Sequence, residues 1–177
     1  MNTTGMDNIA VIGSGTMGNG IAHIFAQTNH KVALIDISEK ALIRGIETIN
    51  RNLDRQVTKG TIDEDTKAKT IGNIRTTTSI QDGVSDADLV IEAATEQLEL
   101  KLSIFKEMDS HAPPSAILAT NTSSISITRI ASITNRPEKV IGMHFMNPVP
   151  MMKLVEIIRG LATSEETFEA TKDLALH

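Results

Sequence analysis

Cysteine does not occur among the 177 residues. Without a thiol, the chain can form no disulfide, thiolate metal site or cysteine nucleophile, which fits a reducing compartment. Any redox chemistry must therefore come from a bound cofactor. The sequence also has no window approaching ~18 apolar residues, and its N-terminus carries neither a basic leader nor an apolar signal region. We therefore expect a soluble, cytoplasmic protein with no membrane partner.

A strong excess of either charge is also missing. The 17 basic residues are balanced by 22 acidic residues, for a net charge of −5. This balance excludes a general affinity for nucleic acid, so any basic patch must be local. We assign no metal site. The length and the 40% share of hydrophobic residues are those of a single globular unit with a buried core.

Short β-rich runs alternate with stretches of helical periodicity along the whole chain. The pattern predicts strands at 8–12, 31–35, 74–77 (an edge strand), 89–93, 116–119, 140–144 and 153–158. It predicts helices at 16–27, from Ser38 and Glu39 to about Thr58, within the polar stretch that follows, at 96–108, at 126–132 and from Ser164. Such alternation is typical of an α/β fold of the Rossmann type, a doubly wound, mostly parallel sheet with helices on both faces.

A glycine-rich turn lies between the first strand and the first helix. Its sequence, GSGTMG, matches the dinucleotide-binding pattern GxGxxG. The first glycine permits a tight turn, the second lets a pyrophosphate approach the backbone, and the third lets helix and strand pack closely. The free N–H groups of the helix N-terminus then face the phosphates. We predict that this loop binds the cofactor through Gly13, Gly15, Thr16, Met17 and Gly18.

An acidic residue closes the second strand. Asp36 lies 18 residues after Gly18, where a carboxylate accepts hydrogen bonds from an adenosine ribose diol and repels a 2′-phosphate. This position favours NAD over NADP. The alternative is that Asp36 merely caps the following helix.

Three further motifs follow in order. They are NTSS at 121–124, HFMNP at 144–148 and KLVE at 153–156. Together with the glycine loop they resemble the 3-hydroxyacyl-CoA dehydrogenase family, including the bacterial 3-hydroxybutyryl-CoA dehydrogenases, over essentially the whole chain. Thr120 and Met146 are mild departures, where the family often has serine and phenylalanine.

The resemblance implies an NAD-binding domain over residues 1–177 and an enzyme of fatty acid metabolism. The implied reaction moves a hydride between NAD and (S)-3-hydroxyacyl-CoA or 3-oxoacyl-CoA, with a short acyl chain such as 3-hydroxybutyryl. Family members resemble two-domain homodimers whose helical C-terminal half closes over the acyl-CoA. We expect that half to be absent, because the last helical segment ends without a glycine cap, as in a longer protein that has been cut.

His144 and Glu156 are the candidate catalytic pair. Oxidation of a secondary alcohol requires a base for the hydroxyl proton, and a histidine held near neutrality suits that role. Glu156 interrupts an apolar strand, where we expect it to be buried and therefore to need a partner. The glutamate would orient the imidazole and stabilise the imidazolium. The alternative is a structural histidine. His23, His30, His111 and His177 have no such context, and we interpret them as surface or packing residues.

Five more polar residues receive roles from the resemblance. Ser123 would bind the substrate oxygen, and Asn147 would orient the nicotinamide ribose or the loop that carries the histidine. Asn121, Glu96 and Lys101 match positions that resemble cofactor contacts. The alternatives are an ordinary turn for Ser123 and solvated helix charges for Glu96 and Lys101.

The long second helix carries a row of basic residues. Arg44, Arg51, Arg55 and Lys59 are spaced by seven, four and four residues, so they share one helix face. That stripe could bind the phosphates of coenzyme A, chiefly through Arg51 and Arg55. Stripes of this kind are more often only solvated faces.

Two other functions remain open at this point. One is a dehydrogenase of free β-hydroxyacids, which shares a similar glycine loop but uses a catalytic lysine; Asp36 and the His144/Glu156 pair argue against it. The other is a non-catalytic NAD-binding protein, since lambda-crystallin of the eye lens resembles the same family. The combination of His144, Glu156 and Ser123 favours catalysis.

Overall fold

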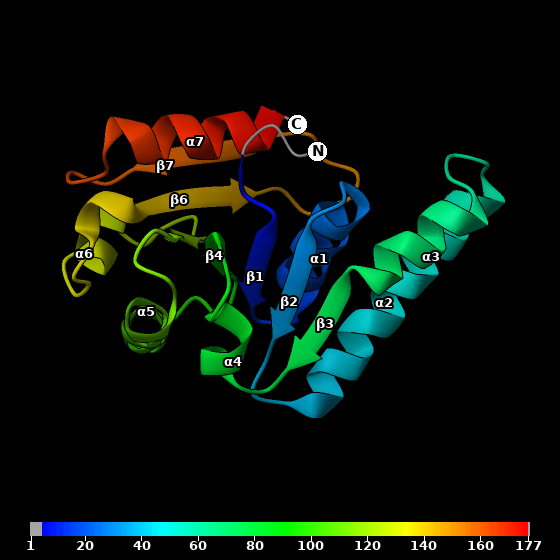
Figure 1. Cartoon of the computed structure of the whole chain (residues 1–177), viewed down its shortest axis with the longest axis horizontal. Coiled ribbons are helices and arrows are strands. Elements are labelled where there is room, and N and C mark those ends of the chain that lie inside the picture. Colours follow the sequence, from blue (N-terminus) through cyan, green and yellow to red (C-terminus); the bar gives the residue numbers. More distant parts are fainter. Residues whose placement is uncertain (1–4, 177) are drawn as a thin grey trace.

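The computed structural model describes residues 5–176, and these form one seven-stranded sheet in the order β3-β2-β1-β4-β5-β6-β7 (Figure 1). The strands up to β6 are parallel, and β7 is antiparallel to β6. Their bounds are β1 (Asn8–Ile12), β2 (Lys31–Ile35), β3 (Ile74–Thr77), β4 (Leu89–Glu92), β5 (Ile117–Thr120), β6 (Val140–Phe145) and β7 (Val155–Arg159). This topology confirms the predicted Rossmann-type, mostly parallel sheet.

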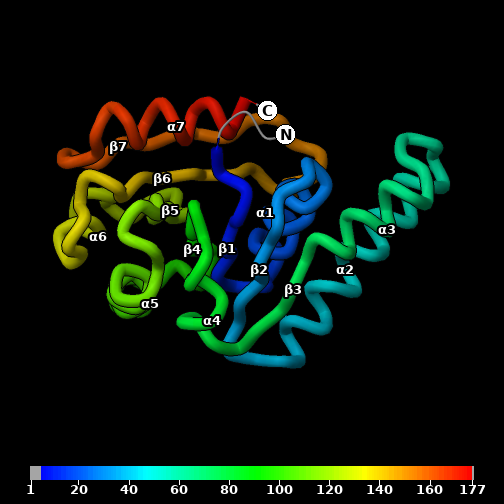
Figure 2. Tube along the Cα trace, viewed as in Figure 1, coloured from blue at the N-terminus to red at the C-terminus, as the bar shows by residue number. Residues whose placement is uncertain are grey.

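Helices cover both faces of the sheet. They are α1 (Thr16–Gln27), α2 (Glu39–Thr58), α3 (Glu64–Gly72), α4 (Ile80–Val84), α5 (Leu98–His111), α6 (Ile127–Ala131) and α7 (Glu165–Leu176), with a 3₁₀ turn at Pro137–Lys139. Residues of α1, α2 and α7 pack in one buried cluster, and residues of α4, α5 and α6 pack in the other. Helices α2 and α3 form a hairpin beside the edge strand β3 (Figure 2). None of the described helices is long and apolar enough to cross a membrane.

The central strands are apolar because they are buried on both faces. In β1, Ile9 and Val11 belong to the cluster under α1 and α2, whereas Ala10 and Ile12 belong to the cluster under α4 and α5. A strand with two buried faces reads as a continuous hydrophobic run rather than an alternating one. That is why these strands could be located from the sequence.

The periphery differs from the prediction in several details. The last strand begins at Val155 rather than Lys153 and pairs in the antiparallel sense as an edge strand. The five-residue helix α4 and the 3₁₀ turn were not predicted, because segments this short contain too few residues to show a period. The predicted start of α2 is confirmed, since the Ser38 hydroxyl accepts a hydrogen bond from the Ala41 amide.

Of the two roles predicted for His23, surface or packing, the structure shows packing, because this residue is fully buried. Its Nε2 lies 3.4 Å from Nε2 of Gln56 on α2, and Nδ1 has no hydrogen-bond partner among the described residues. Burial lowers the pKa of His23 below 6.5, against a smaller raising effect of the nearby Gln27 side chain. His30 is also buried with a lowered pKa, and the exposed His111 is a surface residue; His177 lies outside the described residues.

We predict that His23 makes the folded state sensitive to acid. The unfolded chain binds this proton at a higher pH than the folded chain, so the stabilisation is fully present above about pH 6.5 and is lost as the pH falls toward the folded-state pKa. The free energy of unfolding, measured with urea between pH 7.5 and 5.0, should fall less steeply in His23→Gln than in the wild type. The exposed His111→Gln variant should keep the wild-type slope. Equal slopes for all three proteins would contradict the prediction.

Candidate active site

The carboxyl ends of the central strands bring the predicted site residues together. A cavity of about 330 Å³ opens there, beside the point where the strand order reverses between β1 and β4. Ligands bind at this position in doubly wound sheets. The cavity is lined by Met17, Ala93, Ala94, Glu96, Asn121, Ser123, His144, Phe145, Met146 and Asn147. Residues predicted from four separate segments of the sequence therefore share one cavity.

His144 and Glu156 form the expected pair. They are directly opposite each other on β6 and β7, and Nδ1 of His144 lies 2.7 Å from Oε2 of Glu156. If the Nδ1 proton is donated to the carboxylate, Nε2 is the nitrogen that can accept a proton. The expectation that Glu156 is buried was wrong. Its side chain is 52% exposed, against 21% for His144, because β7 is an edge strand.

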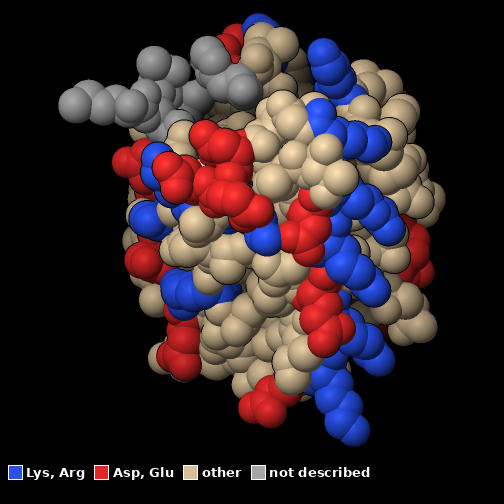
Figure 3. All heavy atoms as spheres, turned by 90° about the vertical axis from the view of Figure 1, so that its right-hand side faces the viewer, with Lys and Arg blue, Asp and Glu red and all other residues tan. Residues whose placement is uncertain are grey.

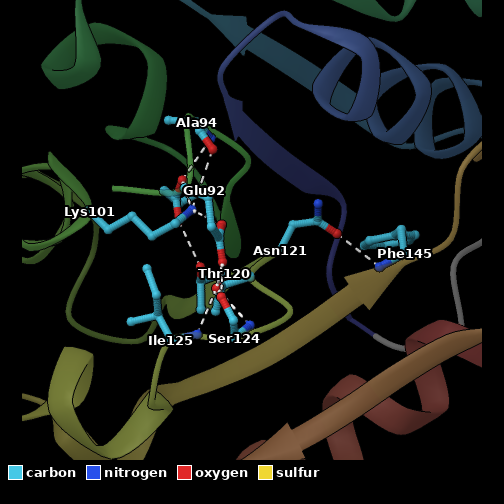
Figure 4. Close-up of polar contacts among 10 residues, drawn as sticks. Glu92, Ala94, Lys101, Thr120, Asn121, Ser124, Ile125 and Phe145 are labelled. Atoms are coloured by element: carbon cyan, nitrogen blue, oxygen red, sulfur yellow. Dashed lines mark hydrogen bonds and ion pairs between the residues drawn. The ribbon is translucent and has the colours of Figure 1, made fainter. Parts of the chain in front are cut away.

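Asn121 is placed to support the histidine. Its Oδ1 accepts a 2.8 Å hydrogen bond from the backbone N–H of Phe145, the residue after His144 (Figure 4). The bond joins the loop after β5 to the end of β6. Asn121 therefore holds the backbone next to the candidate base, and a contact with the cofactor stays a prediction.

Ser123 lies exposed in the cavity wall, next to a turn that its neighbour makes. The hydroxyl oxygen of Thr122 accepts hydrogen bonds from the Ser124 and Ile125 amides, at 3.4 and 3.1 Å. The serine-type turn therefore belongs to Thr122, and the Ser123 side chain is left facing the cavity. Asn147, in the loop after β6, lines the same wall.

The glycine loop has the geometry that its pattern predicts. Gly13 has φ +99°, and a Cβ there would lie 2.7 Å from the Ala93 carbonyl oxygen. A Cβ on Gly18 would lie 1.7 Å from the Gly13 carbonyl oxygen, so α1 can approach β1 only without a side chain at this position. A Cβ on Gly15 would meet nothing within 4 Å. Gly15 precedes α1, and among the described residues no side chain caps that helix.

Open space thus lies in front of an uncapped helix N-terminus, an arrangement that fits a pyrophosphate. Asp36 completes the loop from the end of β2. Its Oδ2 accepts hydrogen bonds from the backbone N–H and the hydroxyl of Ser14, at 2.9 and 2.8 Å, and its Oδ1 accepts one from the Ser38 amide. Because Ser38 is the residue that caps α2, the alternative role of Asp36 as the cap is wrong.

Glu96 and Lys101 have different surroundings, because Glu96 lies in the loop before α5 rather than on the helix predicted from 96, whereas Lys101 lies on α5. Glu96 faces the cavity, and its side chain is 42% exposed. Lys101 is fully buried, so its interpretation as a solvated helix charge is wrong. Its Nζ lies 2.8 and 2.9 Å from the two oxygens of Glu92 and 3.4 Å from Oε2 of Glu96. Lys101 is absent from the cavity wall, and direct contact with a cofactor stays a prediction.

Sequence reasoning missed Glu92. This residue ends β4 and is fully buried, and its carboxylate accepts hydrogen bonds from the Ala94 amide and the Thr120 hydroxyl besides those from Lys101 (Figure 4). The available signal was a single acidic residue inside the apolar run LVIEA, with a lysine nine positions later. A buried carboxylate needs a cation or several donors.

The pKa of Glu96 is lowered from its ordinary value. Partial burial alone would raise this pKa, but hydrogen bonds from Thr122 and Ser124 and the charge of Lys101 outweigh the effect of burial. The carboxyl is therefore ionised at neutral pH and adds a negative charge to the cavity wall.

The predicted basic stripe is exposed along α2 and its C-terminus. Arg44, Arg51, Arg55 and Lys59 all have exposed side chains, and Figure 3 shows a column of Lys and Arg on the side of the molecule formed by α2 and α3. The structure thus leaves both interpretations open, a solvated face and a phosphate-binding face.

We predict that alanine destabilises the fold strongly at one glycine of the loop and only slightly at another. Gly18→Ala should lower the free energy of unfolding by about 3 kcal/mol or more, because Cβ would overlap the Gly13 carbonyl oxygen and force α1 away from β1. Gly15→Ala should change it by less than about 1 kcal/mol, since its backbone is already extended and Cβ meets open space. Denaturant unfolding of both variants checks this, and equal losses would contradict it.

Comparisons with known proteins agree with this geometry. Residues 8–177 match the family described as "3-hydroxyacyl-CoA dehydrogenase, NAD binding domain". A 3-hydroxybutyryl-CoA dehydrogenase of Bradyrhizobium diazoefficiens is 52% identical over 93% of this chain and 56% of the relative. A 3-hydroxyadipyl-CoA dehydrogenase of Escherichia coli is 47% identical over 97% of this chain and 36% of the relative.

Among solved structures, the (S)-3-hydroxybutyryl-CoA dehydrogenase of Ralstonia eutropha superposes with a TM-score of 0.94 at 44% identity. The superposition covers 97% of this chain and 60% of that one. The chain thus spans less than two thirds of the length of each of these three relatives. On this evidence the chain belongs to the family of NAD-binding domains of 3-hydroxyacyl-CoA dehydrogenases.

Proposed function

We propose that this chain carries the cofactor site and the catalytic pair of an NAD-dependent 3-hydroxyacyl-CoA dehydrogenase. The reaction is the oxidation of an (S)-3-hydroxyacyl-CoA to the 3-oxoacyl-CoA, or its reverse. The observation that carries the proposal is that His144, which is paired with Glu156, lines one cavity with Ser123, Asn147 and Met17 of the glycine loop. A base, a hydroxyl donor and a dinucleotide-binding loop are what transfer of a hydride from a secondary alcohol requires.

The proton of the reaction is assigned to His144. Its Nε2 takes the hydroxyl proton during oxidation and returns it during reduction, while Nδ1–H stays bonded to Glu156. The Glu156 carboxylate fixes the ring orientation and stabilises the imidazolium. When bound, NAD supplies the hydride acceptor at the nicotinamide ring. Ser123 donates a hydrogen bond to the oxygen on the reacting carbon, and Asn147 orients the nicotinamide ribose or the histidine loop.

The loop residues would hold the cofactor. Gly13, Gly15, Thr16, Met17 and Gly18 would surround the pyrophosphate, and Asp36 would exchange its hydrogen bonds with Ser14 for those of the adenosine ribose. Glu96 lies in the cavity wall, where it would contact the nicotinamide ribose. Lys101 and Asn121 would bind the cofactor beside it.

We infer a short acyl chain, because most of the relatives described above are named for 3-hydroxybutyryl-CoA. The alternative to a short acyl chain is a longer, dicarboxylic one, because one relative is named for 3-hydroxyadipyl-CoA. Residues 1–177 would be the NAD-binding domain, and a helical domain would account for the further length of the relatives. The full-length enzyme would be a cytoplasmic homodimer in fatty acid metabolism.

The first test mixes the chain with NADH and acetoacetyl-CoA and follows absorbance at the reduced-nicotinamide band. The wild type should oxidise NADH only when acetoacetyl-CoA is present. His144→Gln should lower the rate constant by at least ~10² while the dissociation constant for NADH stays nearly unchanged. A wild type that binds NADH but does not oxidise it would contradict turnover by this chain alone. Normal turnover in His144→Gln would remove His144 from the mechanism.

A second prediction concerns the basic stripe. If Arg51 and Arg55 bind coenzyme A phosphates, replacing both with glutamine should raise the KM for acetoacetyl-CoA about tenfold. The KM for an acetoacetyl thioester of pantetheine, which has no nucleotide phosphates, should stay unchanged. The matched control is Lys106→Gln with Arg129→Gln, which removes the same charge from exposed positions on α5 and α6. Equal effects of the two double variants would mean a general charge effect and a solvated stripe.

A further inference from the structure

A buried ion pair lies behind the wall of the cavity. Glu92, at the end of β4, and Lys101, in the early part of α5, are both fully buried, and Nζ lies within 2.9 Å of both carboxylate oxygens. Charged residues are almost never fully buried unless they are paired. The Glu92 carboxylate also accepts hydrogen bonds from the Ala94 amide (2.6 Å) and the Thr120 hydroxyl (2.7 Å).

Stability alone does not account for this pair. Removing two charges from water is costly, and buried ion pairs can often be replaced by apolar side chains of similar volume with no loss of stability. What an ion pair adds is a defined direction, because each hydrogen bond of the carboxylate fixes the place of one partner. In Glu92 these partners belong to β5, to the loop after β4 and to α5. The pair thus fixes both ends of the loop 93–97.

That loop carries Glu96, which connects the pair to the substrate side of the cavity. Lys101 Nζ lies 3.4 Å from one Glu96 oxygen. The other Glu96 oxygen accepts hydrogen bonds from the hydroxyls of Thr122 and Ser124, the two neighbours of Ser123. A continuous series of contacts therefore runs from Glu92 through the ammonium group and Glu96 to the loop of Ser123.

From this geometry we infer that Glu92 is a positioning residue of the active site. Through Lys101, Glu92 holds the Glu96 carboxylate against the loop 121–126. It thereby fixes the positions of Glu96 and Ser123 in the cavity wall. The expected effect of Glu92 on cofactor affinity rests on the proposed function. The expected effect of Glu92 on the loop does not, because it can be measured without any ligand. Without the Glu92 charge, Glu96 is the one carboxylate beside the buried ammonium in the described part of the chain, and the ammonium draws it away from Thr122 and Ser124.

The test replaces Glu92 with glutamine, which keeps the shape and removes the charge. In the ligand-free chain, amide hydrogen exchange of the segment 121–126 should accelerate about tenfold, because the Ser124 and Ile125 amides are bonded to the Thr122 hydroxyl that Glu96 holds. The dissociation constant for NADH, read from nicotinamide fluorescence, should rise about tenfold. The chain has no Trp or Tyr, so the protein adds little fluorescence of its own.

The matched control is Asp109→Asn. Asp109 lies on the same helix α5, is buried and pairs with Arg136 at 2.8 Å, but neither residue lines the cavity. It should lose stability in denaturant as Glu92→Gln does, while exchange of 121–126 and NADH affinity stay within about twofold of the wild type. Equal changes in the two variants, or none in Glu92→Gln, would overturn the inference.

A second variant covers the case in which Glu92→Gln does not fold. Glu92→Gln combined with Lys101→Met removes both charges and should fold, because no unpaired charge is left inside. Exchange of 121–126 should still be accelerated, since Glu96 has lost its cation. Wild-type exchange in this double variant would overturn the positioning role. A wild-type chain that fails to bind NADH would instead contradict the proposed function, and the exchange measurement would still decide the inference.

Discussion

The parallel alignment of β1, β4, β5 and β6 is the constraint on which the rest of the structure depends. It brings the carboxyl ends of four strands to one edge, so that residues far apart in the sequence line one cavity. The alignment in turn requires α1 to pack closely on β1. That contact leaves no room for a side chain at Gly18, where Cβ would overlap the Gly13 carbonyl. The same close packing points the N-terminus of α1 toward the edge where the cavity opens.

The charged pairs at this edge of the sheet are stabilised in two different ways. His144 on β6 pairs with Glu156 on the edge strand β7, where water reaches the carboxylate and the cost of keeping a charge is small. Glu92 and Lys101 are fully enclosed, so their mutual attraction and additional hydrogen bonds must compensate for lost hydration. The carboxylate of the first pair stays in reach of water, whereas the enclosed pair holds its hydrogen-bond partners in place.

Much of the fold could be predicted from the sequence because the central strands are buried on both faces. Runs such as 8–12 and 31–35 contain only residues that such strands tolerate, apart from their first positions. The His144–Glu156 contact could be predicted because a histidine and a glutamate each follow or interrupt an apolar run and match a family motif. The exposure of Glu156 could not be predicted, since the apolar residues around it resemble those of a buried strand, although β7 has a neighbour on one side only. The antiparallel sense of β7 could not be predicted either, since the residue pattern of a strand does not give its direction relative to the neighbouring strand.

The sequence by itself determined the class of fold, the order of the strands and helices along the chain, the position of the glycine loop and the residue types available for catalysis. These are local properties, encoded in hydrophobic period and in glycine spacing. Only the tertiary structure decided which polar residues meet. It enclosed Lys101, which the helix pattern alone would leave in solvent, and it gave Glu92 a role, because contacts across β4, β5 and α5 join residues 9 and 28 positions apart. Such contacts depend on how the helices and strands pack, and the hydrophobic pattern of the sequence does not specify that packing.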